Sequence, residues 1–187
     1  MINAQDNYVS KMPLLQTDPN KGGGGGVLPL TNGEFINAVF PTPPERAFAA
    51  VCSKSGDPSK GGWPAQRADQ AIVTLAPTAN NYVNCSSFYH GDNGSFRALK
   101  GKFAACHFLM LDDLGTKVDL DRFEDFDLSW LLETSPGNYQ AGIIFDKPII
   151  EGAEAERLLN TLIDANLCDA GAKQPLARWA RMPVAIN

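Results

Sequence analysis

One apolar stretch, AACHFLML at Ala104–Leu111, constrains the fold of this chain more than any other feature. It has the length of a strand, and a strand without polar alternation is usually covered on both faces of its sheet. We therefore expect a central, fully buried strand. The stretch is also the longest candidate for a membrane segment, but it falls short of the roughly 18 apolar residues that a membrane helix needs. The sequence thus predicts a sheet with a covered middle strand and no membrane partner.

The remaining composition favours one domain with a substantial core. The chain has 187 residues, 44% of them hydrophobic. The N-terminal sequence MINAQDNYVSKM has no basic segment leading into an apolar run, so we expect no secretion signal and a cytoplasmic location. Its four cysteines form no CxxC pair, which favours buried free thiols over a structural zinc site. They are Cys52, Cys85, Cys106 and Cys168.

Net charge limits how the chain could contact nucleic acid. A formal charge of −5 argues against tight general binding, because phosphates are neutralised by clustered Lys and Arg. Any contact would have to use a local basic patch. Arg97, Lys100 and Lys102 lie within six residues of one another, and Arg178 and Arg181 form a second candidate patch.

The two ends of the chain differ in character. Residues 1–26 are polar and end in a run of glycines, which predicts a flexible tail followed by a folded domain over 27–187. Thr31 is placed to cap a helix, with Glu34 completing a capping box. The apolar positions of this helix, expected to face the core, are Phe35, Ile36, Val39 and Phe40.

The rest of the chain reads as several strands, one further helix and a final extended piece. Strands are predicted at 46–53, 71–75, 82–88, 104–111, 128–133 and 139–145, a loop at 54–64, a turn at 80–81, a helix at 151–166 and an extended segment at 178–186. Regular alternation of strands and helices is absent. This order predicts an α+β fold with a mixed, largely antiparallel sheet and helices packed on one face.

Two adjacent acids, Asp112 and Asp113, end the buried strand. Neighbouring carboxylates repel each other unless a cation lies between them, and Mg²⁺ is commonly held by one or two carboxylates plus substrate phosphates. Both side chains could serve one metal only if the strand bulges or ends there. The alternative is a solvated junction between strand and turn, where Asp is common. Asp119 and Asp121, two residues apart on an extended chain, form a rival metal site.

Two further polar segments could contribute to a site. TSPGNYQ at 134–140 fits a type II turn between two strands, with Ser135 and Gln140 flanking it. Asp169 precedes Arg178 and Arg181, whose guanidinium groups suit bidentate contacts to phosphate if a turn brings them together. Surface charge in an acidic protein is the alternative explanation. His107, inside the apolar run, is expected to be a hydrogen-bonded core residue rather than a catalytic base.

In their order along the chain, these segments resemble the RepB-type branch of the archaeo-eukaryotic primase superfamily, found in phage and plasmid replication proteins. The matching segments are HFLMLDDLGTKV (107–118), WLLETSPGNYQAGIIF (130–145) and DAGAKQPLARWARMPVAIN (169–187), with NNYVNCSSF (80–88) as a weaker match. The resemblance implies an RRM-like primase–polymerase core. It also implies synthesis of primers from nucleoside triphosphates on a single-stranded DNA template, together with a replicative helicase region or protein, in the host cytoplasm if the chain is phage-encoded.

The same resemblance assigns roles to individual residues. Asp112, Asp113 and Asp169 would be the catalytic acids that bind Mg²⁺ or Mn²⁺. Ser135, Asn138, Gln140, Arg178 and Arg181 would bind the nucleotide. The acids are adjacent here, whereas the superfamily usually separates them by one residue, and Gln140 stands where many members have histidine. The chain also ends inside the last matching segment, where relatives continue toward a helicase region. A non-catalytic replication-initiation module that binds single-stranded DNA or a partner helicase is the first alternative function. A second alternative keeps the fold and changes the reaction to nucleotide binding or phosphodiester cleavage.

Overall fold

The computed structural model describes residues 30–57, 59–169, 176 and 178–185, so the tail expected over 1–26 lies outside the described residues. In the described part of the chain, seven strands form one sheet. They are β1 (Phe48–Lys54), β2 (Gln66–Arg67), β3 (Asn80–Phe88), β4 (Phe103–Leu114), β5 (Trp130–Ser135), β6 (Asn138–Ile149) and β7 (Trp179–Arg181). The helices are α1 (Asn32–Val39), α2 (Ala68–Ala71) and α3 (Gly152–Asp164), with 3₁₀ turns η1 (Ile72–Thr74), η2 (Lys100–Lys102) and η3 (Leu120–Phe123).

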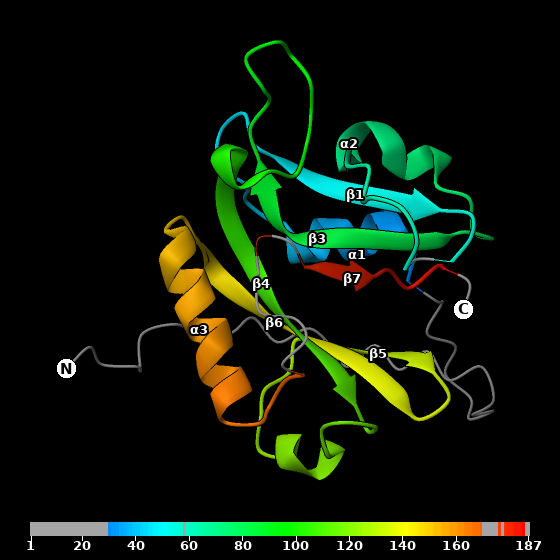
Figure 1. The fold of residues 1–187 in the computed structure, drawn as a ribbon, viewed down its shortest axis with the longest axis vertical. Coiled ribbons are helices and arrows are strands. Elements are labelled where there is room, and N and C mark those ends of the chain that lie inside the picture. The colour runs from blue at the N-terminus through cyan, green and yellow to red at the C-terminus, as the bar shows by residue number, and fades with distance from the viewer. Residues whose placement is uncertain (1–29, 58, 170–175, 177, 186–187) are drawn as a thin grey trace.

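The sheet is antiparallel and divides near its middle. Its strands follow the order β2-β1-β3-β4-β6-β5, with β7 paired to β3 off this path. The later half of β3 pairs with β4, where Ser86 lies opposite Cys106. The earlier half pairs with β7, where Tyr82 lies opposite Arg181. β4 turns away from β3 and continues alongside β6, while β7 lies along β3 (Figure 1). The predicted α+β fold with a largely antiparallel sheet is confirmed.

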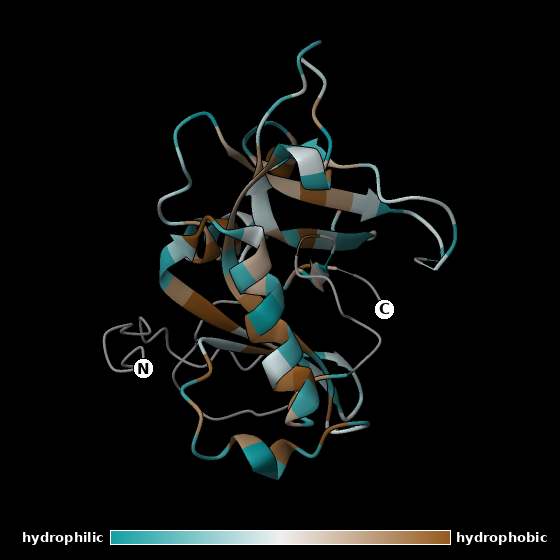
Figure 2. Ribbon diagram, turned by 60° about the vertical axis from the view of Figure 1, so that its left-hand side comes forward, coloured by the Kyte–Doolittle hydropathy of each residue, from teal (hydrophilic) through white to brown (hydrophobic). Residues whose placement is uncertain are grey.

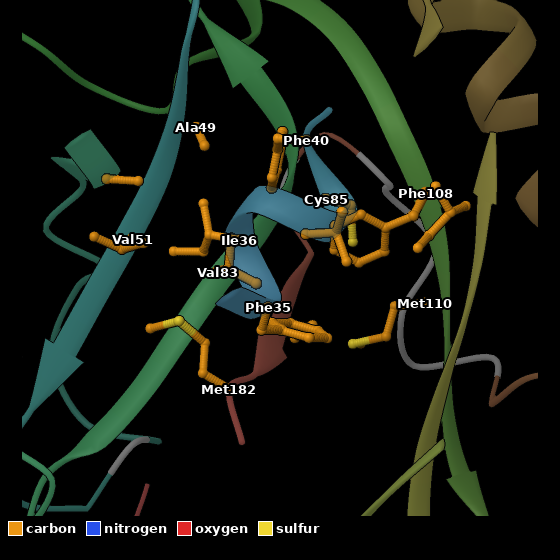
Figure 3. Packing of buried hydrophobic residues seen from close by; sticks show 14 of the residues in the cluster. Phe35, Ile36, Phe40, Ala49, Val51, Val83, Cys85, Phe108, Met110 and Met182 are labelled. Atoms are coloured by element: carbon orange, nitrogen blue, oxygen red, sulfur yellow. The ribbon is translucent and has the colours of Figure 1, made fainter. Parts of the chain in front are cut away.

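The apolar run at Ala104–Leu111 forms the buried middle of β4, as predicted. Alternate residues of β4 pack into two separate clusters, one on each face of the sheet. Phe108 and Met110 join the cluster that contains α1, shown in Figure 3. Leu109 and Leu111 join the cluster that contains the leucines of α3, a helix whose two-sided colouring is visible in Figure 2. Only Ala155 of α3 belongs to the first cluster. The two long helices therefore cover opposite faces, and the expectation that they share one face is wrong.

The first helix begins as the sequence predicts. The Thr31 hydroxyl oxygen accepts from the Glu34 N–H at 3.2 Å, and the Glu34 carboxylate accepts from the Thr31 N–H at 2.8 Å. This capping box satisfies N–H groups that have no partner within the helix. Asn32 exchanges two hydrogen bonds with the backbone of Val184, at 2.9 and 2.8 Å. Helix α1 thereby anchors the segment that leaves β7.

Two local predictions are wrong. The strand expected at 71–75 is the end of α2 followed by η1, in which Val73 is 86% exposed. The turn expected at Asn80-Asn81 is the start of β3, paired with the end of β1. Asn81 is buried because its amide nitrogen donates to the carbonyl oxygens of Ala76 and Val184. Tertiary hydrogen bonds therefore override the turn preference of these two asparagines.

The predicted hairpin and second helix are confirmed as β5–β6 and α3. Gly137 has φ of +74°, as the third position of a type II turn requires. Gly142 lets the buried Trp130 ring approach the backbone of β6, since an added Cβ would lie 2.0 Å from the indole nitrogen. All four cysteines are free and buried. Among the described helices, none has the length and apolar character needed to cross a membrane.

Candidate active site

The acidic pair lies where β4 departs from regular pairing with β6. The register shifts between Leu111 and Leu114, and Asp113 has φ of +58°, which is uncommon for a residue other than glycine. The Asp112 carboxylate accepts from the Asp113 N–H at 3.0 Å. The bulge that both carboxylates would need in order to share a face is therefore present.

Contacts with β6 show that the two acids do share a face. The Asn138 amide donates to Asp113 at 3.2 Å, and the Gln140 amide donates to Asp112 at 3.0 Å. Asn138 and Gln140 are two residues apart on one strand, so their side chains project from the same side. Asp112 and Asp113 consequently lie side by side, each held by an amide of β6.

Gln140 also connects the acids to β7. Its amide oxygen accepts from the Arg181 N–H at 2.9 Å, while its amide nitrogen donates to Asp112. Gln140 is 8% exposed, and these two bonds satisfy an amide that would otherwise be buried without partners. This side chain therefore joins β6 to both β4 and β7.

Asp169 reaches the pair through a lysine that the sequence analysis missed. The Lys117 ammonium lies 2.7 Å from the Asp113 carboxylate and 3.3 Å from the Asp169 carboxylate. Burial pushes the pKa of Asp113 upward, but hydrogen bonds from Lys117 and Asn138 outweigh it, and the pKa lies below its ordinary value. The hydrogen bonds to Asp113 and Asp169 raise the pKa of Lys117. The position of Lys117, four residues after Asp113 across a glycine turn, was the available signal.

The two arginines diverge. Arg178 is 5% exposed, and its Nη1 donates to the Met110 carbonyl and lies 3.1 Å from the Cys168 sulfur. Within the described part of the protein, its Nε and Nη2 atoms have no hydrogen-bond partner. The charge of Arg178 contributes to the low pKa of Asp113. Arg178 is therefore a buried cation close enough to affect Asp113.

Arg181 points toward β3 instead. Its guanidinium donates to Asn80 at 3.0 Å and to the Tyr82 hydroxyl at 3.3 Å, and it lies 5.3 Å from the centre of the Tyr82 ring. Burial raises the pKa of Tyr82, the positive charge of Arg181 opposes this rise, and the negative charge of Asp112 adds a smaller increase. Arg181 and Asp112 thus belong to one neighbourhood, whereas the two guanidinium groups do not converge.

Other predicted residues lie elsewhere. Ser135 closes the β5–β6 hairpin opposite Asn138 and, in the described structure, forms no hydrogen bond with either acid. Lys100 and Lys102 precede β4, at the opposite end of that strand from the acids, about 30 Å away along an extended chain. Lys102 pairs with Asp92 at 2.8 Å. Arg97 lines a separate groove.

The rival metal site is not formed as expected. Asp119 caps η3, with its carboxylate accepting from the Asp121 N–H at 3.2 Å, so the pair does not lie on an extended chain. His107 is a core residue, as predicted. It is 2% exposed, and its Nε2 lies 2.9 Å from the Ser87 hydroxyl. Burial lowers the pKa of His107 to about 4, which keeps the ring neutral.

The acidic pair has a donor set that suits a hard divalent ion. Within the described ranges, no group of three or more Asp, Glu, His or Cys side chains could hold a metal on its own. Mg²⁺ needs fewer, because it is usually held by one or two carboxylates together with waters and substrate phosphates. Lys117 already places a positive charge between Asp113 and Asp169. A site for positive charge therefore exists at the end of β4.

Comparison with solved structures identifies the architecture. The chain is similar to the archaeo-eukaryotic primase domain of the cyanophage S-2L primase–polymerase, with a TM-score of 0.50, 15% identity and coverage of 79% of this chain and 78% of that one. It is also similar to the catalytic domain of the primase RepB', solved in complex with initiator DNA, with a TM-score of 0.53, 15% identity and coverage of 81% and 73%.

The fold is of the archaeo-eukaryotic primase type. The resemblance that the sequence segments indicated is confirmed at the level of fold. No protein-family model matches the chain, and a search of curated proteins gives no match.

Proposed function

We propose that this chain is a divalent-metal-dependent nucleotidyltransferase, a DNA primase or primase–polymerase of phage or plasmid replication. One observation carries the proposal. In a primase-type fold, Asp112 and Asp113 lie on one face of the sheet, with Asp169 joined to them through Lys117. Its substrates would be nucleoside triphosphates and a single-stranded DNA template. A cyanophage primase–polymerase among the similar structures supports the replication context.

Asp112 and Asp113 would hold Mg²⁺ or Mn²⁺, with Asp169 as the third acid. Bound there, the metal would lower the pKa of an attacking 3′-hydroxyl and neutralise charge on the triphosphate. The chain's own residues supply the geometry. Asn138 and Gln140 fix the two carboxylates by hydrogen bonds, so that little reorganisation is needed when the substrate binds.

Cations around the acids would hold the triphosphate. Lys117 is the most accessible of them, with a side chain 60% exposed, and it can move from the carboxylates to a phosphate. Arg181 is connected to Asp112 by way of the Gln140 side chain. Arg178 is buried and would contribute a fixed positive charge from within the protein. Ser135 and Asn138, which pair at the β5–β6 turn, would also contact the nucleotide. Phosphoryl transfer needs mainly such positioning and charge stabilisation.

A primer-synthesis assay tests the proposal. The purified protein is expected to incorporate labelled nucleotide on a single-stranded template with Mn²⁺ or Mg²⁺ and not with EDTA. Ribo- and deoxyribonucleoside triphosphates are tested in separate arms. Asp112→Asn and Asp113→Asn are each expected to lower incorporation at least 100-fold. Asp125→Asn, which changes an exposed acid that follows η3, is the control and should retain incorporation. Intact template-directed extension in both acid variants would show that the metal ligands are assigned wrongly.

The same assay addresses the alternative of a non-catalytic initiation module. Such a module would bind single-stranded DNA and incorporate nothing with either metal. A helicase region or protein is the expected partner in both cases, and we place the protein in the cytoplasm of its host.

A further inference from the structure

A large open groove lies at the end of β1, apart from the acidic pair. It has a volume of about 940 Å³ and is lined by the end of β1, the β1–β2 loop and the β3–β4 loop. Trp63 forms part of its wall and contacts Tyr82 with ring centres 5.0 Å apart. Tyr82 alternates along β3 with Val83, which packs against α1. The groove therefore opens on the face of β1 and β3 that α1 does not cover.

The groove is positively charged in an acidic protein. The described residues that line it include the basic side chains Lys54, Lys60 and Arg97 and one carboxylate, Asp57. Asp57 pairs with Lys60 at 3.6 Å. With a formal charge of −5 on the whole chain, this local excess of positive charge points to an anionic ligand.

Trp63 adds an aromatic surface that is held rigidly. Its ring stacks on Trp179 of β7 at 5.5 Å with an interplanar angle of 11°, and Tyr82 contacts it edge-on. The Lys54 ammonium lies over the Trp63 ring, 4.5 Å from its centre, so a base that packs on this face would take the place of the ammonium. Trp63 is nevertheless 40% exposed. A fixed, partly exposed indole beside cations is the combination that binds unpaired bases and their phosphates.

A chain of contacts leads from this groove to the acids. Trp179 and Arg181 belong to the same three-residue strand, and Arg181 lies over Tyr82. The Arg181 N–H bonds to Gln140, which donates to Asp112. These contacts through β7 join the groove to the acidic pair.

We propose that this groove binds single-stranded nucleic acid, with a base packed against Trp63 and backbone phosphates on Lys54 and Arg97. The inference rests on the proposed function and adds where the template lies. A duplex is excluded as the preferred ligand because its bases are already paired and stacked, and the aromatic wall would add nothing to its affinity. The groove is open, which suits a single-stranded nucleic acid that passes through it.

Fluorescence anisotropy with labelled oligonucleotides tests the groove in EDTA, so that chemistry plays no part. Probes are oligo-dT, oligo-rU and a duplex of equal length. Trp63→Ala is expected to weaken binding of the single strands about tenfold, with Trp63→Phe retaining most of the affinity. Arg97→Gln should lower the slope of log affinity against log salt by about 0.7, the contribution of one phosphate contact on a single strand.

Matched variants make the outcome decisive. Arg157→Gln, which removes a cation from the exposed side of α3, is expected to leave affinity and salt slope unchanged. Asp112→Asn is expected to bind the oligonucleotide while losing incorporation, so failure of the groove and failure of the proposed chemistry are distinguishable. Circular dichroism checks that each variant is folded. If Trp63→Ala does not fold, Lys54→Gln replaces it and is expected to lower the salt slope as Arg97→Gln does. The inference would be overturned if Trp63→Ala and Arg97→Gln bound single strands as tightly as the unchanged protein does, or if the protein preferred the duplex.

Discussion

The side chain of Gln140 donates a hydrogen bond to Asp112 at 3.0 Å from a position that is 8% exposed. The same amide accepts from the backbone of β7, so one residue joins three strands. Removing this amide should therefore affect both the acids and the seating of β7.

Gln140→Leu is expected to lower primer synthesis at least tenfold, because Asp112 loses the bond that orients it and the Arg181 N–H loses its acceptor. Loss of a buried hydrogen bond should also cost about 1–3 kcal/mol in the free energy of unfolding. Gln140→His, the residue that many members of the resembled superfamily carry there, keeps a donor toward Asp112 and should retain more activity. Initial rates and urea unfolding measure the two effects. Equal activity of the Leu and His variants would contradict this role.

Lys117→Met should tighten Mn²⁺ binding severalfold. The Lys117 ammonium now satisfies Asp113 and Asp169, so a divalent ion must compete with it for these carboxylates. Titration followed by Mn²⁺ electron paramagnetic resonance gives the affinity without any turnover. Lys147→Met, on the exposed outer part of β6, is the control and should leave the affinity unchanged. Weaker Mn²⁺ binding by the Lys117 variant would show that the lysine supports the site rather than competing for it.

Gly142→Ala should destabilise the domain by about 3 kcal/mol. An added methyl group would lie 2.0–2.6 Å from three atoms of the Trp130 indole, which is fully buried and cannot move aside. Gly101→Ala is the matched control, because no atom lies within 4 Å of its added Cβ. Urea unfolding of both variants provides the comparison, and similar midpoints would contradict the packing argument.

Stability should fall with acidification between pH 6.5 and about 4 because of His107. Its pKa is about 4 in the folded state and 6.5 as a free side chain, so the unfolded state binds more protons in this range. The stabilisation is fully present above pH 6.5, and about 3 kcal/mol is lost as the pH approaches 4. His107→Gln, which keeps a polar contact to Ser87, should flatten this slope. Denaturant midpoints across the range check it, and an unchanged slope would contradict the assignment.

Sequence predicted those parts of the fold that depend on local chemistry. The capping box of Thr31 and Glu34 and the buried run of β4 are fixed by short-range spacing and apolar length, and both are confirmed. The strand expected at 71–75 failed because Ile72, Val73 and Thr74 are β-branched, which favours a strand when packing is unknown. In the structure they continue the turn begun by α2.

Of the candidate active site, only the acidic and amide side chains could be predicted from the sequence. Asp112, Asp113 and Gln140 were named from the ends of the predicted strands, and the structure brings them together. The two acids share a face because the pairing of β4 with β6 shifts register between Leu111 and Leu114. This shift depends on both strands, so the sequence of β4 alone does not predict it. Lys117 and Trp63 lie in loops, where partners depend on tertiary packing, and neither was identified.

The anchoring of β7 by α1 affects how the site is assembled. Asn32 and Val184 are separated by 152 positions in the sequence, and contacts of such range form late because much chain must be ordered first. The three residues of β7 have little pairing of their own to hold them on β3. Mild denaturant is therefore expected to release this strand before the sheet melts, and catalytic competence should disappear while most of the secondary structure is still present.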